Sequence, residues 1–330
     1  MSEHDVRPSP LASLFVIGVG SLWGLYWLPL RQLDRVAEAG PWVTLAVVLI
    51  GSLVLAPLAW AGRSRLAASS WKSLASLALG GASFVLYSNG LLYGNVAVVI
   101  LLFYLTPVWS TLIVRFGLGW PVSQARIAAI VSGLTGIVLV LKGSHPGLPV
   151  PKTLGDLFGL SSGLLWSVAS TGIHLHSRAG AAETTFVFCA GGTAMAAVLA
   201  VVLSPELPGF PSGQTLPALA WLFMLGCGWW GASLTGFMWA TRRLEPARVG
   251  ILLMSEVVVG AVSAAILAAE SFGLLMTIGA CLVVAAGGLE TLSQYPGRAL
   301  HGPGLMRLHA SEGQVQGPDN SKQKRGKSKR

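Results

Sequence analysis

The sequence is poor in charged residues. Asp, Glu, Lys and Arg make up only 11% of the 330 residues, whereas soluble domains carry about a quarter. Hydrophobic residues account for 53% of the chain. This shortage of charge excludes an ordinary soluble domain and predicts an all-α membrane protein that crosses the bilayer several times.

Motifs for metals, redox chemistry and nucleotides are also missing. The three cysteines, Cys189, Cys227 and Cys281, lie in apolar runs without CxxC spacing, so we interpret them as small packing residues. There is no HExxH or Walker motif. Residues 159–163 match G-x-S-x-G, but inside an apolar run rather than at a strand-to-helix turn. We therefore expect no enzymatic activity, no ATP-driven transport, no metal and no cofactor.

Apolar runs of helix-spanning length follow one another along the chain. They fall into two sets of five, separated by a Pro- and Gly-rich linker at residues 144–154. Their approximate bounds are 11–30, 41–61, 73–93, 96–115 and 125–142, then 155–176, 184–203, 216–240, 246–268 and 272–291. The sequence thus predicts a short tail (1–10), two five-helix units (11–143 and 155–291) and a basic tail (292–330).

The distribution of basic residues supports ten spans. If the amino terminus lies in the cytoplasm, ten basic residues fall on the cytoplasmic side and four outside, even without the basic tail. The cytoplasmic ten are Arg7, Arg63, Arg65, Lys72, Arg115, Arg126, Arg178, Arg242, Arg243 and Arg248; the external four are Arg31, Arg35, Lys142 and Lys152. The protein is therefore expected in the plasma (inner) membrane, with both termini in the cytoplasm.

Five spans is an odd number, and this has a consequence for the architecture. If the two units are repeats, the second must be inverted relative to the first, as in many secondary carriers with a substrate site near the midplane. A weak echo joins residues 95–116 to the stretch 244–270, with Thr106-Pro107 opposite Glu256-Val257. The fold class expected is two inverted five-helix repeats.

Glu256 is the leading candidate for function, because it lies near the middle of an apolar run. An ionisable residue at that depth is costly and should face protein or a watery cavity. One interpretation is a proton-coupling acid or an anionic partner for a cationic group on the substrate. The other is a structural glutamic acid bonded to Ser255 or to a hydroxyl of the fourth span. Glu270, at the external end of the same run, is expected to cap the next helix.

Further candidates surround a possible cavity. Proline at 107 frees a backbone carbonyl one turn earlier, so we expect a helix kink there. Side chains that could line the cavity are Tyr104, Thr106, Trp23, Tyr26 and Trp166. Small residues that recur every fourth position favour close helix packing; they are Gly155, Gly159 and Gly163 in the sixth span, and Gly20 and Gly24 in the first.

The basic tail has too little apolar surface to fold alone. The basic residues clustered at 322–330 indicate membrane topology or binding to anionic lipid rather than binding to nucleic acid. It also offers the element that a non-transporting scaffold or sensor would use to bind a partner.

The arrangement resembles the drug/metabolite transporter superfamily, and within it the EamA-type ten-helix exporters. The resemblance rests on residues 21–24 (SLWG), 105–107 (LTP), 254–256 (MSE), and Ala269-Glu270 with Gly279. It implies inverted five-helix units around a central cavity. The chain differs from the family pattern in Val257, where proline often follows the glutamate, and at residues 116–120, where a glutamate is often found.

The resemblance implies a secondary active transporter that exports a small polar metabolite, such as an amino acid, with proton exchange as a frequent mode. A cationic drug, a vitamin-like compound, or a scaffold or sensor role remains the alternative. The expected partners are a small-molecule substrate, protons and the lipid bilayer, with the chain as monomer or homodimer.

Overall fold

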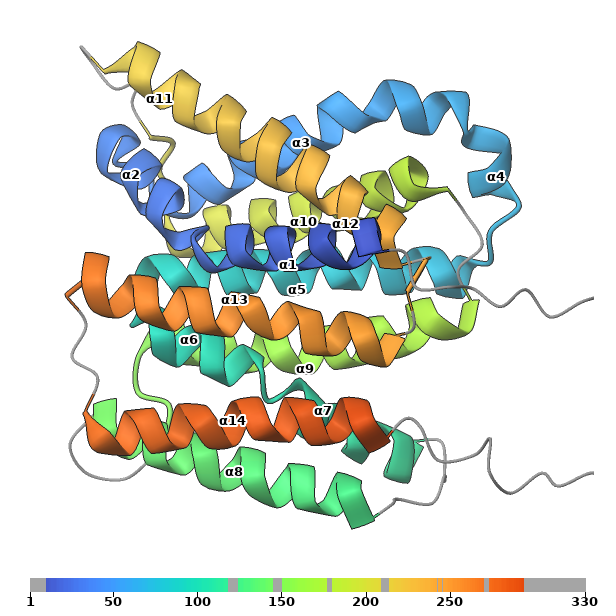
Figure 1. Ribbon diagram of the computed structural model, residues 1–330. Coiled ribbons are helices and arrows are strands. Elements are labelled where there is room, and N and C mark those ends of the chain that lie inside the picture. Colours follow the sequence, from blue (N-terminus) through green and yellow to red (C-terminus); the bar gives the residue numbers. More distant parts are fainter. Residues whose placement is uncertain are drawn as a thin grey trace, which may run out of the picture. The chain divides into compact units, whose positions relative to one another are not determined.

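The computed structural model describes residues 10–117, 124–144, 150–176, 180–208, 214–241, 243–244, 246–269 and 273–293. These residues are almost entirely helical and contain no strand (Figure 1). The elements in chain order are α1 (Pro10–Gly24), α2 (Trp27–Ala37), α3 (Pro41–Ala61), α4 (Arg63–Ala67), α5 (Trp71–Tyr93), α6 (Val96–Phe103), α7 (Thr106–Leu112), the π-helical η1 (Ile113–Gly117), α8 (Gln124–Ser144), α9 (Leu154–His176), α10 (Ala181–Leu203), α11 (Thr215–Phe223), the π-helical η2 (Met224–Ser233), α12 (Leu234–Thr241), α13 (Pro246–Leu267) and α14 (Leu274–Ser293).

The predicted all-helical class is confirmed, and each of the ten predicted apolar runs coincides with a helix or an interrupted helix. Within the described residues, five segments are long and apolar enough to cross a membrane; they are Pro10–Ala37, Pro41–Ala61, Trp71–Tyr93, Ala181–Leu203 and Thr215–Thr241. Shorter apolar helices include Val96–Leu112, Ile127–Gly143, Leu252–Leu267 and Leu274–Leu289. The protein is therefore a multi-pass helical membrane protein.

Proline accounts for two breaks in these segments. Pro29 has no N–H to donate to the carbonyl of Leu25, and α1 gives way to α2 at the turn of residues 25–26. Pro107 lies in the first turn of α7, and the chain turns at residues 104–105 just before it. The hydroxyl of Thr106 donates to the freed carbonyl of Phe103 at 2.8 Å. Each break places a tyrosine, Tyr26 or Tyr104, at a bend inside the protein.

A third interruption has a different cause. Residues Thr215–Thr241 form one helix whose centre, η2, widens into ten residues of π-helix. This stretch contains three glycines and two consecutive tryptophans, Trp229 and Trp230. π-helical turns are rare and are often found at functional sites.

Helices of the first half pack mainly on helices of the second half. Figure 1 shows α8 alongside α14 and α1 alongside α13, and both pairs are in contact. In the same way α5 packs on α9 and α10, α3 on α10 and η2, and α6 on α9 and α13. The two halves are therefore interleaved rather than built as two separate bundles.

Glycine lets these backbones approach closely. A Cβ at Gly24 of α1 would lie 2.6 Å from the carbonyl oxygen of Glu256 and 2.8 Å from the amide of Gly260, both in α13. A Cβ at Gly20 would meet the Ser255 hydroxyl. On α9 the equivalent positions contact the first half: Gly155 meets Gly94, Gly159 lies 3.0 Å from the Val99 carbonyl, and Gly163 lies 2.6 Å from that of Phe103.

The substitution Gly24→Ala tests this packing. The new methyl group would strike backbone atoms that cannot turn away, and overpacking of this kind costs about 1–3 kcal/mol. We expect the thermal unfolding midpoint in detergent to fall by about 5 °C. Gly18→Ala in the same helix is the control, since nothing lies within 4 Å of its Cβ position. Equal midpoints for the two variants would contradict the packing role.

Candidate functional site

Two tyrosines hold the Glu256 carboxylate inside the protein. Glu256 is only 4% exposed on α13. Tyr87 donates to its Oε1 at 3.0 Å, and Tyr104 donates to its Oε2 at 2.8 Å. Buried carboxyl groups require such partners, because hydrocarbon offers none. We call this three-residue arrangement the tyrosine clasp.

The clasp joins three elements that are distant in sequence. Tyr87 projects from the C-terminal half of α5, and Glu256 from the middle of α13. Tyr104 stands at the turn between α6 and α7, and its hydroxyl also lies 3.1 Å from the carbonyl oxygen of Leu253. The break before Pro107 therefore supplies the residue that reaches α13.

Glu256 also lines a small internal cavity with a volume of about 30 Å³. Six of its nine lining residues are aromatic; the set is Trp23, Tyr26, Phe84, Tyr87, Ser88, Trp229, Trp230, Leu234 and Glu256. The residues come from both halves of the chain. A cavity of this volume holds about one water molecule, so a metabolite can enter only if the walls move apart.

Hydrogen bonds within the protein occupy the polar groups of the wall. The Trp23 indole N–H donates to Ser233 at 2.9 Å. That of Trp229 donates to the Leu22 carbonyl at 3.2 Å, and that of Trp230 to the Tyr26 hydroxyl at 3.1 Å. These bonds fix the aromatic rings and leave Glu256 as the single charged group among the lining residues.

The structure brings together some of the residues singled out in the sequence and separates others. Trp23, Tyr26 and Glu256 line the cavity, and Tyr104 contacts Glu256 from behind it. Ser255 instead hydrogen-bonds the carbonyls of Ile17 and Leu252, towards α1.

Two further candidates lie away from the cavity lining. Thr106 bonds at the helix break, where its carbonyl also accepts from Ser167 at 3.2 Å. Trp166 packs 5.3 Å from the lining residue Phe84, ring centre to ring centre. Glu270 and the Pro107 side chain lie outside the described residues.

Sequence reasoning missed six of the nine residues that line the cavity. Phe84, Tyr87 and Ser88 belong to one face of α5, and their spacing of three and four residues was the available signal. Trp229 and Trp230 gave no such signal, because the sequence does not show that their segment is π-helical. The π-helical widening of η2 brings both to the cavity.

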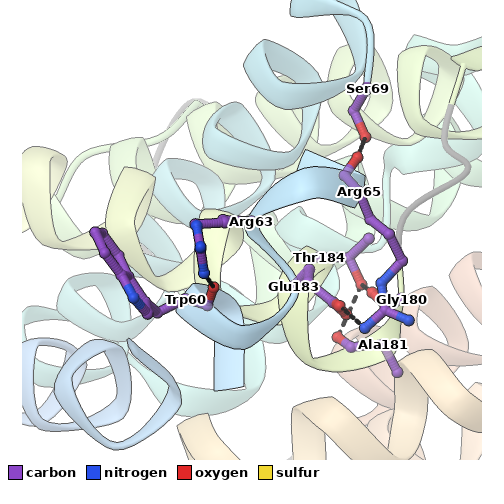
Figure 2. Close-up of polar contacts among 8 residues, drawn as sticks. All are labelled: Trp60, Arg63, Arg65, Ser69, Gly180, Ala181, Glu183 and Thr184. Carbon is purple, nitrogen blue, oxygen red and sulfur yellow. Dashed lines mark hydrogen bonds and ion pairs between the residues drawn. The ribbon is translucent and has the colours of Figure 1, made fainter. Parts of the chain in front are cut away.

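A second polar cluster links α4 to the start of α10 (Figure 2). Arg65 forms an ion pair with Glu183, whose side chain is 3% exposed while that of Arg65 is 66% exposed. Glu183 lies in the first turn of α10, where the helix dipole favours a negative charge. Neighbouring Arg63 is different: it donates to the Trp60 carbonyl of its own segment at 3.3 Å, and its guanidinium lies over the Trp60 ring.

Among the described residues, no group of three or more His, Cys, Asp or Glu side chains could hold a metal ion. The site consists of a carboxylate, tyrosine hydroxyls and aromatic rings at breaks in apolar helices. Such an arrangement is typical of membrane carriers, in which interrupted helices form the substrate site.

Comparison with known proteins identifies the family. Residues 10–142 match the model of the EamA-like transporter family. This part of the chain belongs to that family, a member of the drug/metabolite transporter superfamily, so the resemblance seen in the sequence is confirmed. The match over residues 10–142 points to a membrane transporter of the drug/metabolite type, which implies a small-molecule substrate.

Solved structures support the fold. One chain, described as "Crystal structure of protein", is 22% identical with a TM-score of 0.57 and covers 86% of this chain and 98% of its own. The similarity extends well beyond residue 142, and at this identity it concerns the fold alone. No curated protein matches the chain.

The ion pair at α4 predicts unequal effects of two arginine substitutions. Arg65→Met leaves the buried Glu183 carboxylate without its cation, and since Arg65 is largely exposed we expect a loss of about 1–2 kcal/mol in unfolding free energy. Arg63→Met, the control, should change it by less than about 0.5 kcal/mol. Thermal unfolding of both purified variants is the measurement, and a larger loss for Arg63→Met would contradict the assignment.

Proposed function

We propose that the protein is a secondary active carrier that moves a small amine-bearing metabolite, an amino acid being one candidate, by alternating access. The observation that carries the proposal is a buried carboxylate lining a cavity shared by both halves. A carboxylate at this depth serves either to bind a cationic group or to exchange a proton, and a carrier can use both in turn. We propose export as the direction, with protons as the coupling ion.

The inverted repeat gains support from the pattern of helix contacts. We number the ten helical segments in chain order. When each segment is exchanged with the one five places away, a contact between two helices becomes another contact that the structure also contains. The pair α1·α13 maps onto α9·α6, α5·α9 onto α12·α1, and α5·α10 onto η2·α3; the pairs α3·α10, α6·α13 and α8·α14 map onto themselves. This is the pattern expected of two related units about a pseudo-two-fold axis.

The glycine contacts of the first and sixth segments are related by the same exchange of segments. Gly20 and Gly24 of the first segment lie against the ninth, while Gly159 and Gly163 of the sixth lie against the fourth; Gly155 lies against Gly94, at the turn just before the fourth. Close glycine contacts without large side chains between the helices also suit helices that must shift against one another. Because the halves are interleaved, we propose that access changes by movement of helix pairs rather than by rocking of two separate five-helix blocks.

Orientation completes the proposal. We propose that both termini lie in the cytoplasm and that the protein lies in the plasma (inner) membrane; the excess of basic residues on one side supports the orientation of the termini. The Arg65–Glu183 pair then lies at the cytoplasmic ends of the second and seventh segments.

The substitution Glu256→Gln tests the carrier. It keeps the size of the side chain and removes the charge, so we expect the initial rate of transport to fall by about tenfold or more while expression is kept. Flux is measured in proteoliposomes with a panel of radiolabelled amino acids and organic amines. Glu206→Gln, the same change at an exposed loop position, is the control and should retain full flux. Unaltered flux in Glu256→Gln would remove Glu256 from the mechanism.

Deletion of residues 295–330 separates a carrier from a scaffold or sensor. A carrier whose chemistry lies at Glu256 should keep most of its flux without the basic tail. We expect at least about half of the initial rate in proteoliposomes, normalised to the protein inserted, with only a modest loss of anionic-lipid binding. A complete loss of flux in a protein that still unfolds at the normal temperature would favour the partner-binding alternative.

A further inference from the structure

We propose that the cavity selects organic monocations, that is, ammonium compounds with an apolar body, over zwitterions, anions and neutral molecules. The proposal deepens the transport function proposed above and rests on it. It narrows the substrate class from metabolites bearing an amino group to those that carry no carboxylate beside it.

The charge of the wall is the first argument. Glu256 is the single charged residue among the lining residues, and no Lys, Arg or His lines the cavity within the part of the chain that the structure describes. An ionised carboxylate has about four acceptor positions, and the tyrosine clasp uses two. The remaining lone pairs can accept from an ammonium group that arrives from the cavity side.

The aromatic wall is the second argument. Trp23, Tyr26, Phe84, Tyr87, Trp229 and Trp230 surround a space of about 30 Å³, so when the walls move apart to admit a head group, these rings are the surface it meets. A cation close to such rings is attracted by their quadrupoles, most strongly by tryptophan, and more so when water is excluded. A carboxylate combined with several rings is thus a site for positive charge, whereas an anion would meet repulsion from both.

The third argument concerns hydrogen-bond donors. A zwitterionic substrate needs donors for its carboxylate, and the wall could offer only indole N–H and hydroxyl groups. The three indole N–H groups already donate to Ser233, the Leu22 carbonyl and Tyr26. The Tyr87 hydroxyl donates to Glu256, and Ser88 donates to the Phe84 carbonyl at 2.8 Å.

The Tyr26 hydroxyl, which accepts from Trp230 and Ser88, is the one lining donor left to meet a carboxylate. Beyond that single bond, a carboxylate placed in this cavity would break an existing bond or stay unpaired close to Glu256. Either outcome is costly at low dielectric. Rejection of the zwitterion follows from the same wall that attracts the ammonium group, so specificity needs no additional residue.

The test uses four ligands that share a phenyl ring and differ in charge: phenethylamine (cation), phenylalanine (zwitterion), 3-phenylpropionate (anion) and 3-phenylpropanol (neutral). Binding to the purified full-length protein in detergent is measured by isothermal titration calorimetry. We expect phenethylamine to bind at least about tenfold more tightly than each of the others. The comparison needs no substitution, so it does not depend on whether a variant folds.

Two further measurements assign the effect to the wall. Glu256→Gln should bring the affinity for phenethylamine to within about twofold of that for 3-phenylpropanol. The N,N,N-trimethyl derivative of phenethylamine has no N–H to donate, so its binding reports on the rings. Trp229→Leu should weaken it by about fivefold or more while changing 3-phenylpropanol by less than twofold.

Binding and transport fail in distinguishable ways. Phenylalanine binding as tightly as phenethylamine, or no binding of phenethylamine at all, would overturn the substrate class. Flux of phenylalanine in proteoliposomes without flux of phenethylamine would do the same and leave the carrier intact. Selective binding of phenethylamine with no flux of any compound would overturn the carrier and leave the selectivity standing.

Discussion

The need to satisfy one carboxylate inside apolar helices governs the centre of this protein. Glu256 cannot obtain hydrogen bonds from hydrocarbon, so two tyrosine hydroxyls must reach it, one for each oxygen. Tyr104 does so because the chain breaks before Pro107, and Thr106 in turn satisfies the carbonyl that the break releases. The helix break, Thr106 and the two tyrosines therefore together provide the hydrogen bonds that allow Glu256 to be buried.

The same centre depends on how closely the helices approach. Without a hydrophobic drive between helices in lipid, association rests on packing, and glycine gives the shortest distance between backbones. The contacts of α1 with α13 and of α9 with α6 both use a glycine face against a neighbouring backbone, and these are the contacts that carry Glu256 and the approach to Tyr104. Packing and site are coupled: the aromatic wall keeps its shape only if the glycine contacts hold.

Much of the helical plan was available from the sequence, because apolar runs, prolines and polar turns are local signals. The apolar runs and the break at Pro107 both correspond to features of the structure. Glu256 stood out because a lone acid in an apolar run is rare. Tyr87 and Trp230 did not, since their importance depends on which helices meet. Ser255 was attractive by its position next to Glu256, but one step along a helix turns a side chain by about 100°, and it faces α1.

Interleaving of the halves has a consequence for biosynthesis. The ribosome delivers α1 to α8 before α9 exists, yet the surfaces of α5, α3 and α8 that are apposed to α9, α10 and α14 belong to segments made later. During synthesis these glycine-rich faces must wait in lipid or against the insertion machinery, without their final neighbours. Assembly of the native bundle is therefore a late event, completed only after α14 has left the ribosome and docked on α8.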